Sequence, residues 1–256
     1  MTAGVPFHLG RGDTGPVQQS SLTCGSASLT VARMLVSPEF GQWIVNGIDL
    51  KGGPTDPRPA PERFAEHERE VMNRTNGIRA AGGKLNVPWP RSLGTPPWGA
   101  EKELELGAAP PGAAYAMRLV RLGSSDALRD VYRDLVRRVR EGLPALLYIG
   151  NAWAPRHVTL VLPGENGGGG VGAGGGGGGV GAGGGGNGGA GGWNGGAGGN
   201  GGGGAGGLGA SGRGGGGLDV YDPATGSVIE LAPERFASRC LGIAGWNVPW
   251  IIVQPR

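Results

Sequence analysis

Residues 18–29 read Gln-Gln-Ser-Ser-Leu-Thr-Cys-Gly-Ser-Ala-Ser-Leu, and they place Cys24 at the end of a polar loop. An apolar run, SLTVARMLV, follows the cysteine and predicts a helix over Ser26–Val36 that is buried on most faces. A thiol attacks well only as the thiolate, and its ordinary pKa of about 8.5 means that only a few per cent of the thiol is ionised at neutral pH. The unpaired N–H groups and the dipole of a helix N-terminus favour that anion. The stretch therefore predicts a buried helix that carries an activated thiol at its start.

The rest of the chain predicts an α+β fold. Helices are expected at 61–75 and 100–106, and a third helix is capped by Ser124 or Ser125 and ended by Gly142 and Pro144. Strands are expected at 115–122, 145–149, 157–162, 218–221, 227–231 and 251–254. Because helices come first and antiparallel strands later, we expect N-terminal helices, including the buried cysteine helix, packed on a C-terminal antiparallel sheet.

Glycine dominates one internal segment. Most of the 59 glycines in this chain of 256 residues fall between 164 and 217. The segment has no Gly-X-Y period, which excludes collagen, and it has few side chains to bury. We therefore predict a single domain over 1–256 with a disordered glycine-rich insertion at 164–217, read either as an inert low-complexity expansion or as a flexible tether. Lengthening a loop to this extent costs only about 2 kcal/mol in closure entropy, so the flanking strands can still pair.

Charge and composition exclude several function classes. The net charge is +3, and the densest basic run, 129–140, interleaves Asp130 and Asp134 with arginines on a helical period. That pattern indicates a solvated helix face, and we expect no nucleic-acid partner. The sequence shows no signal peptide or long apolar run, so we expect a cytoplasmic protein without membrane contact, although export by a non-classical route stays open. Two cysteines make no disulfide framework, and no metal-ligand spacing is present, so no metal or organic cofactor is expected.

The chain has three histidines that could activate the thiol. His8 is expected in a frayed N-terminus, and His67 on the exposed side of the helix at 61–75. His157 begins an apolar strand, and Asp222 ends a later one. If these strands are neighbours, the carboxylate can reach Nδ1 of the imidazole and fix its tautomer. The amide of Gln18, with the backbone N–H of Cys24, could then bind the oxyanion of an acyl-transfer intermediate.

The order of these residues resembles papain-like cysteine peptidases. It is most similar to the bacteriocin-processing (double-glycine leader) peptidase family and its stand-alone relatives, over about 16–36 and 140–256 without the glycine-rich segment. The matching residues are Gln18…Cys24-Gly25-x-Ala27-x-Leu29, Gly142-x-Pro144, His157-x-x-x-x-Leu162-x-Gly164 and Asp222-Pro223-x-x-Gly226. The resemblance implies that Cys24 is the nucleophile, His157 the base, Asp222 the orienting residue and Gln18 the oxyanion donor, in preference to Gln19. Thr23 stands where the leader peptidases usually carry an acidic residue, and no transporter segments follow, so neither leader specificity nor coupled export is implied.

Three further expectations complete the functional hypothesis. Gly25 and Ala27 are expected to leave the helix start open to a substrate backbone, and Cys240 to be structural. The sequence Asn-Val-Pro-Trp occurs at 86–89 and again at 247–250, either by coincidence or as similar aromatic turns packed on the core. The alternative is that Trp89 and Trp98 line a substrate groove from a lid-like loop. The function expected is hydrolysis of peptide or isopeptide bonds in a peptide or protein substrate. The alternatives are a thiol acyltransferase or deamidase that uses the same triad, and a catalytically idle papain-like binding module whose glycine-rich loop makes the contacts. The oligomeric state is left open.

Overall fold

The computed structural model describes residues 6–78, 86–87, 89–90, 94–164 and 217–256. The fold is α+β, as expected: N-terminal helices come first and an antiparallel sheet follows. The predicted insertion at 164–217 lies outside the described residues apart from its two end positions. The helices are α1 (Cys24–Val36), α2 (Pro38–Asn46), α3 (Ala60–Asn76), α4 (Pro97–Gly107), α5 (Ser125–Val139) and α6 (Pro233–Ala237). The strands are β1 (Tyr115–Leu119), β2 (Ala145–Gly150), β3 (Pro155–Val161), β4 (Leu218–Asp222), β5 (Ser227–Leu231) and β6 (Val248–Pro255).

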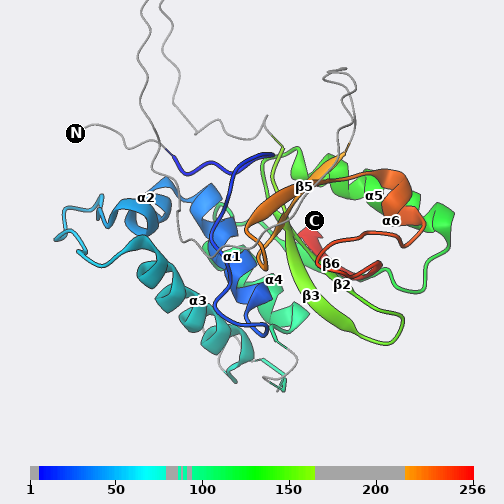
Figure 1. The fold of residues 1–256 in the computed structure, drawn as a ribbon, viewed down its shortest axis with the longest axis horizontal. Helices are drawn as coiled ribbons and strands as arrows, with labels where there is room; N and C mark the ends of the chain where they lie inside the picture. The colour runs from blue at the N-terminus through cyan, green and yellow to red at the C-terminus, as the bar shows by residue number, and fades with distance from the viewer. Residues whose placement is uncertain (1–5, 79–85, 88, 91–93, 165–216) are drawn as a thin grey trace, which may run out of the picture.

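The six strands form one sheet in the order β1-β6-β2-β3-β4-β5, and every neighbouring pair is antiparallel. Helices α1–α4 cover one face of this sheet, and α5 and α6 cover the other (Figure 1). Strand β2 is buried along its whole length, because its alternate side chains enter the two cores: Leu146 faces α1–α4, and Leu147 faces α5 and α6. The two-layered burial fixes the register of the central strands and hence the position of their ends.

Helix α1 lies in the centre of the helical layer, where it packs against α3, α4 and β3. Ten of its thirteen residues are buried, which agrees with the apolar run in the sequence. The helix begins at Cys24, two residues before the predicted start at Ser26. This arrangement is consistent with the papain-like layout expected from the sequence.

Two helices were not among the expected elements. Helix α2 begins after Ser37, whose hydroxyl accepts the N–H of Phe40, and it ends at Gly47, which adopts a left-handed conformation with φ of 72°. Ser-Pro at the start and Gly at the end are ordinary helix boundaries, so the signal is present in the sequence. Helix α6 has only five residues and begins with Pro233.

None of the helices in the described part of the chain combines the length and the apolar character that crossing a bilayer requires.

Candidate active site

The polar loop before α1 holds the thiol in place. The Ser20 N–H donates to Thr23 Oγ1 at 3.1 Å, and this hydroxyl donates back to the Ser20 carbonyl at 3.0 Å. Because the Thr23 side chain closes this turn, it makes no side-chain cap on α1. The first N–H groups of the helix therefore stay available beside Cys24, whose side chain is buried with 4% of its surface exposed.

His157 and Asp222 form a buried pair at the ends of neighbouring strands. Strands β3 and β4 pair through Leu160 and Tyr221, as the sequence analysis required. The imidazole Nε2 lies 2.7 Å from Asp222 Oδ1, and both side chains are 6% exposed. The atom differs from the expectation: Asp222 bonds Nε2, not Nδ1. Since Nε2 is occupied by the carboxylate, Nδ1 is the ring nitrogen left for the thiol.

Electrostatics favour a charged imidazole. Burial alone lowers the pKa of His157, but the hydrogen bonds with Asp222 and Cys24 and the negative charges of these two residues outweigh it and raise the pKa to about 9. The pKa of Asp222 is lowered, because its hydrogen bond with His157 and its backbone contact with Ala224 outweigh the opposing effect of burial. At neutral pH the pair is thus an imidazolium held by a carboxylate, within reach of a thiol.

Cys24 and His157 line the same cavity, which has a volume of about 230 Å³. Its walls are mostly apolar and include Leu22, Tyr148 and Ile251. Trp89 also lines the cavity, and its contact with a substrate stays a prediction. Trp98 does not belong to its described lining; it packs edge-on against Trp89 with 5.0 Å between ring centroids, and thus supports Trp89 from behind.

Gln18 lies beside the turn that follows Asp222. Its backbone N–H donates to the Pro223 carbonyl at 2.9 Å, which ties the loop before Cys24 to the turn that follows Asp222. Its Oε1 is buried and has no hydrogen-bond partner among the described residues. Gln18 is absent from the described cavity lining, so its role as oxyanion donor stays a prediction. The side-chain amide N–H of the exposed Gln19 donates to the Val17 carbonyl at 3.3 Å.

Position 25 requires a glycine because of a neighbouring side chain, not because of a substrate. A Cβ at this position would lie 2.6 Å from the Cβ and Oγ1 of Thr95. Thr95 is buried and is fixed over the helix start by the Ser26 hydroxyl at 3.3 Å, while Tyr148 donates to its carbonyl at 3.1 Å. The expectation that Gly25 leaves room for a substrate is therefore wrong, because Thr95 fills that space. Ala27 is likewise fully buried.

Glu68 is a site residue that the sequence analysis missed. It is fully buried on α3, and its carboxylate accepts the Gln19 N–H at 3.1 and 3.3 Å. Burial raises the pKa of Glu68, and this effect outweighs the hydrogen bonds from Thr23 and Gln19, which lower it. The sequence contained a signal, since Glu68 occupies the inward stripe of α3 between Phe64 and Val71 at four- and three-residue spacing.

The other two histidines do not serve the thiol. The prediction that His67 is exposed is wrong: only 5% of it is exposed, and its ring lies 4.5 Å from that of Phe40. Phe40 belongs to α2, a helix that was not expected, and this helix covers His67. Burial, together with Arg33 and Arg74, lowers the pKa of His67 to about 3. His8 has an exposed side chain near Asp13.

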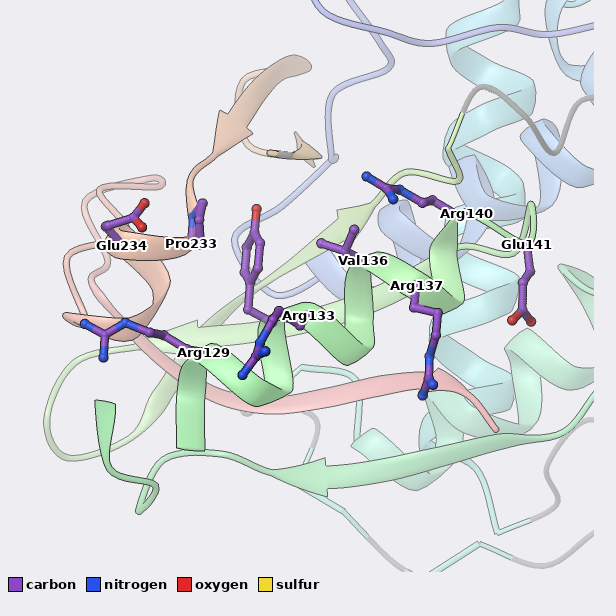
Figure 2. Close-up of a pocket in the computed structure, with 9 residues that line it drawn as sticks. Arg129, Arg133, Val136, Arg137, Arg140, Glu141, Pro233 and Glu234 are labelled. Carbon is purple, nitrogen blue, oxygen red and sulfur yellow. The ribbon is translucent and has the colours of Figure 1, made fainter. Parts of the chain in front are cut away.

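A second cavity of about 740 Å³ lies over α5 and α6, on the other face of the sheet (Figure 2). Its lining is rich in arginine and holds neither cysteine nor histidine. Three of these arginines pair with an aspartate one turn earlier on α5: Arg129 with Asp126, Arg133 with Asp130, and Arg137 with Asp134. This internal pairing is typical of a solvated helix face.

Two further observations concern the remaining candidates. Cys240 is exposed, and its Sγ lies 3.6 Å from the Ser238 carbonyl. In the described part of the chain, no three His, Cys, Asp or Glu side chains gather as a metal site would need.

Comparisons with protein-family models, with curated proteins and with solved structures found no match for this chain.

Proposed function

We propose that this chain is a papain-like thiol hydrolase that cleaves peptide or isopeptide bonds. The observation that carries the proposal is the buried His157–Asp222 hydrogen bond of 2.7 Å, beside a cavity that Cys24 and His157 both line. A buried carboxylate–imidazole pair costs desolvation free energy and is weak evidence of stability by itself. Its position next to a thiol at a helix start is typical of nucleophilic catalysis.

The residues would divide the reaction as follows. The Cys24 thiolate attacks the carbonyl carbon, and the electron pair moves to the oxygen, which accepts hydrogen bonds from the Cys24 N–H and the Gln18 amide. The intermediate collapses with cleavage of the C–N bond, and the leaving amine takes its proton from His157. Water, deprotonated by His157, then attacks the thioester and releases the acid and the thiolate. Throughout both steps Asp222 holds Nε2–H and stabilises the imidazolium.

The size of the cavity limits what can enter it. At about 230 Å³ it is smaller than the ordinary ligand pocket of about 300–1,000 Å³. It therefore suits one side chain of an extended segment rather than a whole compact ligand. This supports a peptide or an exposed loop of a protein as the substrate.

Alkylation by iodoacetamide tests the proposal without knowledge of the substrate. The Cys240→Ser variant reports Cys24 alone, and the Cys24→Ala variant reports Cys240 as an exposed reference thiol. At pH 6 an ordinary thiol is less than about 1% ionised, so we expect Cys24 to react at least about tenfold faster than Cys240. A Cys24 rate no higher than that of Cys240 would refute the hydrolase and favour the idle binding module.

The reaction type needs a second measurement. We expect the Cys240→Ser variant to release amine and acid from a fluorogenic peptide library, and mass spectrometry of the products to show incorporation of one oxygen from water. Products joined to an added amine would instead identify acyl transfer as the main reaction, and conversion of glutamine to glutamate would identify deamidation.

A further inference from the structure

The turn that joins β2 and β3 projects beside the candidate active site. We call residues 151–156 the hairpin tip. Trp153 in this tip is 87% exposed, the largest value among the described large hydrophobic side chains. Pro155, two residues later, lines the cavity of Cys24. Two residues span at most about 7 Å between Cα atoms, so the backbone of Trp153 lies within that distance of a residue that lines the cavity.

The hairpin tip is held in one conformation by side chains from three directions. Asn151 Oδ1 accepts the N–H groups of Trp153 at 2.8 Å and Ala154 at 2.9 Å. The Asn151 carbonyl accepts the indole N–H of Trp250 at 2.9 Å, and the Ala152 carbonyl accepts the Arg121 guanidinium at 3.0 Å. The hydrogen-bonded turn therefore presents the Trp153 side chain to solvent, where its apolar surface is available to a bound chain.

Arg156 gives the hairpin tip a charge. It is exposed, it lines the cavity next to His157, and its guanidinium has no hydrogen bond or ion pair with any described residue. Among the described residues that line the cavity, it is the only Lys, Arg, Asp or Glu. A thiolate, an imidazolium and the Asp222 carboxylate sum to one negative charge, which would repel an anionic substrate. Arg156 offsets that charge at the entrance.

We propose that the hairpin tip is a substrate-recognition element that selects an acidic peptide segment. Arg156 pairs with a carboxylate of the bound chain, and Trp153 packs against the residues that flank it. The proposal rests on the proposed function, because it takes the bound peptide to be the substrate of Cys24. It adds the chemical class of that substrate and the two residues that select it.

The charge of Arg156 can be measured at the thiol itself. Iodoacetate and iodoacetamide both form an S–C bond to Cys24 with loss of iodide, but only iodoacetate is an anion. In the Cys240→Ser background, Arg156→Ala should lower the ratio of the iodoacetate rate to the iodoacetamide rate by about three- to tenfold at low salt. Arg156→Lys should retain most of the ratio, and Arg129→Ala, on the other face of the sheet, should not change it.

The outcomes separate the two proposals. Slow reaction of Cys24 with both reagents, at the rate of Cys240, would refute the proposed function. Fast reaction with a ratio that Arg156→Ala leaves unchanged would overturn the recognition role while the hydrolase stands.

Peptide selection gives the second test. Cleavage of a hexapeptide library by the Cys240→Ser variant should be enriched for Asp or Glu at one position near the cleaved bond, and Arg156→Ala should abolish this enrichment. Amidated and free-acid library termini distinguish a side-chain carboxylate from a C-terminal one. Trp153→Ala should raise KM for hexapeptides with kcat nearly unchanged. Equal cleavage of peptides that carry Glu, Gln or Lys at this position by the Cys240→Ser variant would refute the proposal.

Discussion

Asp222→Asn tests the electrostatic part of the site with the least change of shape. Asn keeps an acceptor oxygen for His157 Nε2–H, at the position now 2.7 Å away, and for the Ala224 N–H at 3.0 Å. It loses the negative charge and the second acceptor, which Thr225 Oγ1 contacts at 3.2 Å. We therefore expect the fold and the 222–226 turn to persist while the imidazolium loses its partner charge.

The magnitude follows from the pKa of His157. The pKa lies at about 9 against an ordinary 6.5, and Asp222 and Cys24 share the effect that raises it. Removal of the Asp222 charge should lower the pKa by on the order of one to two units, equivalent to about 1.4–2.7 kcal/mol. Hydrolysis at pH 9 should then slow by roughly 5- to 50-fold, because the charged fraction of the imidazole falls from about one half to between about 1% and 10%. At pH 7 most of the imidazole stays charged, so the loss from this cause should not exceed about twofold.

Stability should change with pH in the same variant. Because the folded pKa of His157 lies above its unfolded value of 6.5, the charged form stabilises the fold fully below about pH 6.5. This contribution disappears as the pH rises through about 9. The free energy of unfolding of Asp222→Asn, measured by urea denaturation, should therefore fall more at pH 6 than at pH 10.

Three measurements decide the matter: the pH profile of iodoacetamide alkylation, the rate of hydrolysis at pH 9 and the urea titrations at both pH values. An unchanged alkylation profile and a rate of hydrolysis at pH 9 within twofold of the parent would refute the assignment of Asp222 as the orienting residue. Equal destabilisation at pH 6 and pH 10 would show that Asp222 acts only as a cap of its turn.

Substitutions at Cys24, Gln18 and Glu68, with their control variants, test the other residues. Cys24→Ala should abolish hydrolysis and lower the pKa of His157, read by NMR of the imidazole, whereas Cys240→Ser should leave both unchanged; the reverse pattern would show that the wrong cysteine was chosen. Gln18→Ala should cost about 3 kcal/mol of transition-state stabilisation, seen as a fall in kcat with little change in KM, and a loss below threefold would remove it from the oxyanion site. Glu68→Ala should lower the free energy of unfolding by about 1–3 kcal/mol, because it leaves the loop N–H of Gln19 unpaired. Glu68→Gln keeps an acceptor oxygen and should have nearly the parent value. Equal losses in the two variants would contradict a hydrogen-bonding role for Glu68.

The sequence predicted those features that depend on local pattern. The apolar run after Cys24 has no polar face, so its helix had to be buried, and the structure confirms this. The α5 helix has clear apolar spacing and a Ser124 cap, and it was predicted almost to the residue. The strands that carry His157 and Asp222 were predicted from their apolar residues and from the turn residues that bound them. Their antiparallel pairing is confirmed.

The rest required knowledge of contacts between distant segments. The environment of His67 was predicted wrongly because α2 covers it, and no feature of α3 alone reveals a neighbouring helix. The role of Gly25 depends on Thr95, seventy positions later, whose loop is held by Tyr148. The choice of Nε2 over Nδ1 depends on the side-chain rotamer of His157, which its buried surroundings fix and the sequence pattern does not specify.

Glu68 shows how the helical layer supports the candidate site. A buried carboxylate that only filled space could be replaced by a leucine on the same stripe of α3, with less desolvation cost. Glu68 instead accepts the Gln19 N–H, one residue from Gln18, and Gln18 in turn donates its backbone N–H to Pro223 beside Asp222. The N-terminal end of the polar loop before Cys24 is thus fixed both to α3 and to the β4–β5 turn. Because the thiol and the imidazole come from different layers of the fold, their relative position depends on contacts between the layers. These two anchors add to the packing of α1 on β3 and to the Ser28 hydroxyl, which donates to the Val158 carbonyl at 3.3 Å.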